Sequence, residues 1–157
     1  GAEGADKMLH DLQARTGRSV AMGSHACDAA IQCYGKIKRI GIIPPYMPVG
    51  DIQVRKFFEE TGYEVMAIEG LKCASPSLIA HESPRALKRA AEKVNVPGVE
   101  AIVQCGTNLA FGRAAAACEL FMEKPVIAIN TATYWYALRQ NGIEDRITGY
   151  GSLLTDF

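Results

Sequence analysis

The sequence lacks several features that would identify a function directly. Its 17 basic residues are balanced by 17 acidic ones, and no basic stripe with interleaved aromatic residues occurs, so we expect no nucleic-acid partner. No stretch approaches the roughly 20 consecutive apolar residues of a membrane-spanning helix, so we expect no membrane partner. Neither GxxxxGK[ST] nor a GxGxxG turn follows a predicted strand, which argues against nucleotide binding.

The five cysteines lack the pairing used by disulfide-stabilised domains and by many metal sites. Their number is odd and no CxxC pair occurs, so we expect reduced thiols and a cytoplasmic protein. His25 and Cys27 alone are too few ligands for a zinc site. The sequence therefore predicts a protein that uses neither a metal nor an organic cofactor.

What the sequence does contain is a regular alternation of apolar runs and amphipathic segments. Strands are predicted at 19–22, 39–43, 64–68, 100–104 and 125–129, and helices at 5–16, 25–34, 49–61, 84–94, 109–123 and 131–141, before an irregular tail. With 157 residues the chain is long enough for one core, or for one domain plus part of another. Strands and helices that alternate at this spacing predict an α/β fold with a parallel sheet covered on both faces.

Cys105 is the strongest candidate for chemistry. It ends the apolar run that begins at Glu100 and precedes Gly106, Thr107 and Asn108. Open α/β sheets bind ligands at the carboxyl ends of their strands, and a following helix N-terminus would favour a thiolate or a bound anion. The alternative is that Cys105 is one more buried small side chain, as most cysteines are.

The chain also contains a weak internal repeat. When it is shifted by 106 positions, residues 18–22 fall on residues 124–128 and Ala26 falls on Ala132. The alternative is two ordinary helix–strand–helix units. If the repeat is a true duplication, a first strand and a first reactive loop, equivalent to Cys105 and Gly106, would lie upstream of residue 1.

Four stretches together resemble a known family. They are RIGIIPPY at 39–46, VEAIVQCGTNL at 99–109, PVIAINTAT at 125–133 and GYGSLL at 149–154. They resemble the aspartate/glutamate racemase superfamily, and within it the branch of maleate cis-trans isomerases and arylmalonate decarboxylases. The resemblance covers essentially the whole chain. It implies two pseudo-symmetric, flavodoxin-like parallel-sheet halves with the active site between them.

The resemblance also divides the chain. Residues 1–38 match the end of the first α/β half, 39–130 match the second half, and 131–157 match a C-terminal helix and tail that pack back on the first half. The beginning of the first half is then expected to be missing from this chain. The residue in the first reactive loop that separates isomerases from decarboxylases therefore cannot be read.

The resemblance implies a cofactor-free reaction in which a thiol acts as acid or base at a carbon next to a carboxylate. Cys105 matches that thiol, Tyr46 matches a tyrosine that holds a substrate carboxylate, and Gly106 matches a backbone donor. Elementary chemistry agrees, because enediolate charge needs preorganised donors, and a tyrosine hydroxyl with the amides of Gly106, Thr107 and Asn108 could supply them. We expect the pKa of the thiol to be tuned toward neutrality.

Several other residues are secondary candidates. Pro45 and Ser24 are expected to line the substrate site, although Ser24 and Asn130 could simply cap helices, as Thr107 and Asn108 could. Isomerases of the family carry an asparagine in the loop that corresponds to 71–77, and here only Ser75 or Ser77 could replace it. Cys73 borders the expected cleft. The remaining cysteines, at 27, 33 and 118, are expected to be inert.

The sequence thus predicts an isomerase or decarboxylase that acts on a small mono- or dicarboxylic acid. The alternatives are an amino-acid or hydantoin-type racemase, or a non-catalytic flavodoxin-like domain that binds a small anion. Tyr134, Trp135 and Tyr136 suit helix packing or a subunit interface, so a homo-oligomer is an open alternative.

Overall fold

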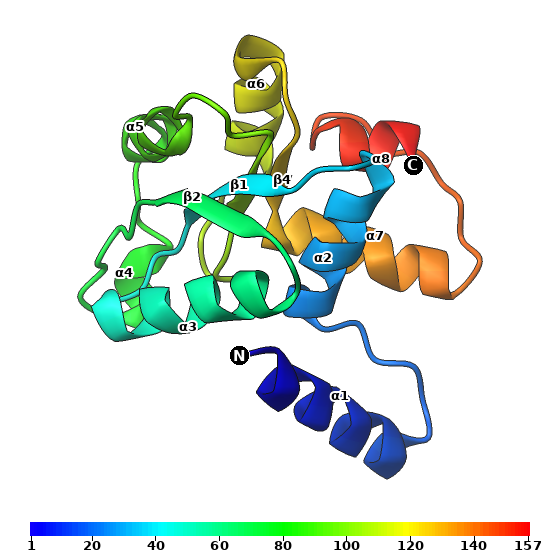
Figure 1. The fold of residues 1–157 in the computed structure, drawn as a ribbon. Coiled ribbons are helices and arrows are strands. Elements are labelled where there is room, and N and C mark those ends of the chain that lie inside the picture. The colour runs from blue at the N-terminus through cyan, green and yellow to red at the C-terminus, as the bar shows by residue number, and fades with distance from the viewer.

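A four-stranded parallel sheet forms the centre of the structure, a computed structural model that describes residues 1–157 (Figure 1). Its strands are β1 (Arg39–Ile43), β2 (Glu64–Ile68), β3 (Ala101–Gln104) and β4 (Val126–Ala128), in the order β2-β1-β3-β4. The predicted α/β fold with a parallel sheet is confirmed.

Helices cover both faces of this sheet. One face carries α2 (Gly23–Cys33), α3 (Pro48–Glu60), α7 (Ile129–Gln140) and α8 (Ser152–Asp156), and the other carries α4 (Pro76–Ile79), α5 (Pro84–Val94) and α6 (Gly112–Met122). Because side chains alternate along a strand, Val103 belongs to the core on the α2 side and Ile102 to the core on the α5 side. Both cores are consequently built from the same short apolar strands.

The connections between strands create a crevice at one edge of the sheet. After β1 the chain passes through α3 to β2, and after β2 it passes through α5, on the opposite face, to β3 on the other side of β1. The loops after β1 and β3 therefore leave the sheet in opposite directions, which is where open α/β folds bind ligands. Tyr46 follows β1 and Cys105 follows β3, so both lie at this switch point.

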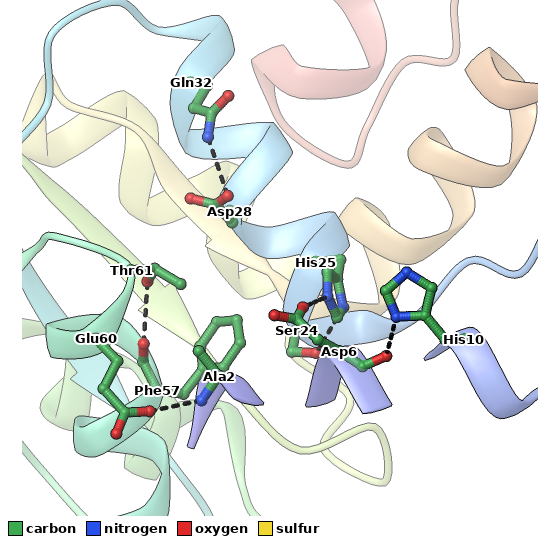
Figure 2. A network of polar contacts seen from close by, with 10 residues as sticks. All are labelled: Ala2, Asp6, His10, Ser24, His25, Asp28, Gln32, Phe57, Glu60 and Thr61. Carbon is green, nitrogen blue, oxygen red and sulfur yellow. Dashed lines mark hydrogen bonds and ion pairs between the residues drawn. The ribbon is translucent and has the colours of Figure 1, made fainter. Parts of the chain in front are cut away.

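The opening helix behaves differently from the rest. Helix α1 (Ala2–Thr16) contacts α3 and buries none of its residues fully. It lies to one side of the body (Figure 1). Polar contacts hold it there: the Ala2 amide donates to Glu60 Oε2 at 2.6 Å, and His25 Nε2 lies 2.8 Å from Asp6 Oδ1 (Figure 2).

Three local predictions were wrong. Residues 19–22 form no strand, because no neighbouring strand is present for them to pair with. The helix predicted from 109 begins only at Gly112, because residues 105–111 continue the loop. Ser24 caps nothing: α2 begins at Gly23, and the Ser24 hydroxyl instead lies 3.3 Å from Nδ1 of His25.

Two helix ends carry recognisable sequence signals. Ser83 accepts a hydrogen bond from the amide of Ala86 and caps α5, whose first residue is Pro84. Gly17 ends α1 in a left-handed conformation, with φ of 63°. The tail predicted as irregular contains the short helix α8.

None of the helices combines the length and the apolar character needed to cross a membrane. No three His, Cys, Asp or Glu side chains gather where they could hold a metal ion.

Candidate active site at the switch point

Two cavities meet at the switch point. The first, which we call the thiol cavity, has a volume of about 370 Å³, and its lining includes Ser24, Cys27, Tyr46, Val54, Phe57, Phe58, Cys105, Gly106 and Ile129. The second, which we call the amide cavity, has a volume of about 330 Å³ and is lined by residues that include Pro45, Tyr46, Cys73, Ser75, Gly106, Thr107 and Asn108. Tyr46 and Gly106 line both cavities, so these two residues join them into one candidate site.

Gly106 has to be a glycine for two reasons. Its φ of 99° is one that residues with a side chain rarely adopt. A Cβ at this position would also lie 2.4 Å from Cγ of Pro45 and 3.4 Å from the hydroxyl oxygen of Tyr46. The loops after β1 and β3 therefore meet at van der Waals distance only because this side chain is absent.

The thiol of Cys105 is shielded from solvent. Only 7% of the surface of Cys105 is exposed to solvent, and the residue lines the thiol cavity. Its amide donates to the Ile43 carbonyl at 3.0 Å. Burial raises the pKa of the Cys105 thiol to about 12. The expectation that this pKa is tuned toward neutrality is wrong, because burial disfavours the thiolate, and α6, whose N-terminus was expected to favour it, begins only at Gly112. At neutral pH Cys105 is thus a protonated thiol, suited to giving a proton rather than taking one.

Tyr46 stands between the two cavities. Its side chain is partly exposed, and its hydroxyl lies beside Gly106 without a hydrogen-bond partner inside the protein. Burial, and secondarily the thiol of Cys105, raise the pKa of Tyr46. The hydroxyl therefore stays protonated at neutral pH and can donate to an anion in either cavity.

The loop after Cys105 presents unused backbone donors. The amides of Gly106, Thr107 and Asn108 make no hydrogen bond within the protein. Neither Thr107 nor Asn108 caps α6, whose N-cap is Phe111. Because all three residues line the amide cavity, this side of the site is rich in neutral donors that suit a carboxylate.

The far wall of the thiol cavity comes from α2. The structure places Ser24 there, together with Cys27. Cys27 was expected to be inert, yet its sulfur lies near that of Cys105. Burial is the main reason that the pKa of the Cys27 thiol is raised, and a negative charge on Cys105 would raise it further. A spacing of three residues between Ser24 and Cys27 on one helix face is the signal that could have identified it.

Ser24 also joins a short polar chain that leads out to solvent. Its hydroxyl contacts His25, which in turn contacts Asp6 of α1 (Figure 2). His25 is half-buried and Asp6 is exposed. This chain links the opening helix to the edge of the thiol cavity.

The loop at 71–77 forms the outer wall of the amide cavity. Cys73 lies there as expected, with its thiol donating to Glu82 Oε1 at 3.3 Å. Burial and the Glu82 carboxylate raise the pKa of the Cys73 thiol. Of the two serines considered, Ser75 lines the cavity and caps α4, whereas Ser77 does not line it.

With the geometry established, comparison with known proteins gives a consistent result. A family model described as arylmalonate decarboxylase matches residues 1–154. A maleate isomerase from Pseudomonas putida strain KT2440 is 29% identical over 122 residues, which cover 76% of this chain and 48% of that protein.

Solved structures agree in fold. The maleate isomerase Iso from Pseudomonas putida S16, a C200A variant solved with maleate, superposes with a TM-score of 0.79 at 26% identity, covering 85% of this chain and 53% of that one. A liganded double mutant of arylmalonate decarboxylase superposes with a TM-score of 0.91 at 20% identity, covering 100% of this chain and 68% of that one. The chain thus spans about half the length of the maleate isomerases that it matches.

Proposed function

The chain belongs to the arylmalonate decarboxylase family, and from this premise we propose that it is part of a cofactor-independent enzyme that protonates a carbon next to a carboxylate. The substrate is a small mono- or dicarboxylic acid. Cys105 is the general acid, and Tyr46 with the amides of Gly106, Thr107 and Asn108 binds the carboxylate and the enediolate formed from it. Pro45 and Ser24 shape the two sides of the substrate site.

The observation that carries this proposal is the protonated thiol beside unused amide donors. A buried thiol with a pKa of about 12 keeps its proton at neutral pH. Proton donation by Cys105 becomes favourable only when a strongly basic carbon forms next to it. An enediolate is such a base, and its oxygen charge is stabilised by the neighbouring amides and by the Tyr46 hydroxyl.

Between the two reactions of the family, the lining of the thiol cavity favours decarboxylation. Val54, Phe57 and Ile129 line the cavity together with Cys105, and no lysine or arginine lines it. An ionised carboxylate held against such a wall is poorly solvated, and loss of carbon dioxide moves that negative charge into the enediolate, where the amide donors can stabilise it. The C–C bond breaks, its electron pair remains as the enediolate, and the proton of Cys105 goes to carbon. The thiolate then regains a proton from solvent.

We also propose that the chain comprises parts of two halves. Residues 1–38 are the end of a first half, 39–130 form the second, and 131–157 pack back on the first. Extensive contact between α2 and α7 supports this division. In a site between two halves, the thiol cavity would face the first half, and a residue there would decide between isomerisation and decarboxylation.

Incubation of the full-length protein in D₂O with phenylmalonate and, separately, with maleate tests the proposal. We expect phenylmalonate to lose carbon dioxide and to give phenylacetate with one deuterium at the α carbon. Conversion of maleate alone, to its trans isomer, would keep the acid role of Cys105 but assign isomerisation. No turnover of either substrate, or of other small carboxylates, by a folded protein would favour the non-catalytic anion-binding alternative.

A further inference from the structure

We infer that Gln104 and Asn130 are positioning residues, which turn the loop after Cys105 so that its three amide N–H groups are available to an anion. The inference rests on the proposed function of that loop and identifies what orients it. Gln104 ends β3, and Asn130 lies in the first turn of α7. The two residues approach the loop from different elements.

Three consecutive carbonyls of the loop are held by these two side chains. Nε2 of Gln104 donates to the carbonyl of Cys105 at 2.6 Å and to that of Gly106 at 2.8 Å. Nδ2 of Asn130 donates to the carbonyl of Thr107 at 2.8 Å. Every peptide group from 105 to 107 is therefore anchored through its oxygen by a side-chain amide.

The anchored oxygens fix the direction of the N–H groups. In a trans peptide the C=O and the N–H of the same plane point in opposite directions. The carbonyls of Cys105, Gly106 and Thr107 share their planes with the amides of Gly106, Thr107 and Asn108. When Gln104 and Asn130 hold the oxygens, the three amides point away from them, and these are the amides that find no acceptor within the protein.

Gln104 is also an improbable residue for its location on packing grounds alone. It is completely buried in a strand whose other residues, Ala101, Ile102 and Val103, are all apolar. Its Oε1 is buried without a hydrogen-bond partner, and an unpaired buried acceptor is destabilising. An apolar side chain would avoid that cost, whereas the two bonds from Nε2 can be made only by a donor at this position. The residue is therefore better explained by the loop that it orients than by the stability of the core.

Asn130 is the exposed one of the two proposed positioning residues, and another asparagine of the chain can serve as a control for its substitution. Its side chain is exposed, so its removal leaves the core intact. Asn141, next to the C-terminal end of the same helix, is also exposed and also donates from Nδ2 to a backbone carbonyl, that of Ala137, at 2.8 Å. The two asparagines make the same kind of bond, and only Asn130 bonds to the loop.

The experiment measures anion binding by the loop in the full-length protein, independently of turnover. Sodium malonate is titrated into ¹⁵N-labelled protein, and the amide signals of Gly106 and Thr107 are followed in the wild type and in Gln104→Met, Asn130→Ala, Ile102→Val and Asn141→Ala. We expect malonate affinity to fall about tenfold in Gln104→Met and in Asn130→Ala, because misdirected amides bind the anion poorly. The two control variants, Ile102→Val and Asn141→Ala, should stay within about twofold of the wild type.

Catalysis supplies the second readout. A positioning role predicts that Gln104→Met and Asn130→Ala lower kcat as well as raising KM, because the enediolate depends on these amides more than the substrate does. If Asn130→Ala, or a folded Gln104→Met, matched its control variant in both malonate affinity and kcat, the inference would be overturned. If Gln104→Met failed to fold, Asn130→Ala alone would decide. A different result would separate the inference from the proposed function. If Cys105→Ala kept full activity while Gln104→Met and Asn130→Ala bound malonate more weakly, the proposed function would be refuted and the inference would stand.

Discussion

The thiol cavity and the amide cavity share Tyr46 and Gly106 but differ in chemistry. The thiol cavity is walled mainly by aliphatic and aromatic side chains around a buried sulfur, with Ser24 and Gln53 as its polar side chains. The amide cavity also has apolar lining, from residues such as Pro45 and Ile79, but it adds the three free backbone N–H groups after Cys105. The apolar wall keeps the proton on Cys105, and the polar wall can hold negative charge. The difference shows how a site without a charged side chain at the reacting carbon can still combine an acid with an anion site.

The largest expected effect comes from removing the acid. In Cys105→Ala the thiol cavity keeps its apolar wall and loses the thiol proposed as the general acid. We expect turnover to fall by a factor of roughly 10³ or more, on the scale of general acid catalysis, while thermal unfolding changes little. Steady-state rates and a melting curve check this. Cys118→Ala, which removes a buried cysteine outside both cavities, should retain wild-type turnover, and equal activity of the two variants would show that the cavities do not differ in function.

The next effect concerns the contact that joins the cavities. In Gly106→Ala the new methyl group meets Pro45 and the positive φ becomes strained, so we expect the free energy of unfolding to fall by about 3 kcal/mol. Gly62→Ala is the matched control, because Gly62 has a similar φ of 96° with no atom within 4 Å of the added Cβ. Strain alone should cost Gly62→Ala about 1 kcal/mol. Equal destabilisation in denaturant titrations of the two variants would mean that the loops after β1 and β3 do not press on each other.

Tyr46→Phe sharpens the comparison by removing the one side-chain donor that both cavities share. Loss of a hydrogen bond to a charged group costs on the order of 1.5–3 kcal/mol, so kcat/KM should fall roughly ten- to a hundredfold without a change in stability. Tyr134→Phe, an exposed tyrosine on α7 outside both cavities, serves as the control. If kcat/KM of Tyr46→Phe equals that of this control, Tyr46 only packs.

A smaller effect should appear in the pH dependence of stability. The folded pKa of Cys105, about 12, lies above its ordinary value of 9.0. The stability that the buried thiol contributes is therefore intact below pH 9 and is lost as the pH rises toward 12. Between pH 9 and pH 10 this group should cost about 1 kcal/mol of unfolding free energy. Urea titrations should show a shallower decline in Cys105→Ala than in the wild type, and parallel declines would mean that burial does not hold the proton on the sulfur.

Much of the sheet could be predicted from the sequence, because its strands are continuous apolar runs. Residues 39–43 and 64–68 were predicted with the bounds of β1 and β2. Residues 19–22 show the limit of such reasoning. Their composition is that of a strand, but a strand forms only beside a partner, and no local pattern reports whether that partner is present.

The internal repeat illustrates the same limit. Shifted by 106 positions, Thr16 at the end of α1 falls on Met122 at the end of α6, and Gly23 at the start of α2 falls on Ile129 at the start of α7. The helix bounds thus agree with the predicted repeat, while the packing does not: α6 lies against β4 and α1 lies against α3. The duplication itself stays a prediction.

In the candidate site, position could be predicted and environment could not. The strand-end location of Cys105 and the Gly106–Asn108 amides follow from the order of elements. The high pKa of the thiol, the second sulfur at Cys27 and the hold of Gln104 on the loop depend on burial and on contacts between distant segments. The role of Gln104 could not be predicted, because the sequence does not show which backbone carbonyls a glutamine inside an apolar run will contact.

The central claim is that Cys105 rests as a neutral thiol, and a direct titration of that sulfur tests it best. Cysteine labelled with ¹³C at Cβ reports ionisation through its chemical shift, and comparison with Cys105→Ser assigns the Cys105 signal. We expect this signal to stay at the position of a thiol up to pH 10, in line with a pKa of about 12. A midpoint at or below about pH 8 would show a thiolate at rest and would contradict the account.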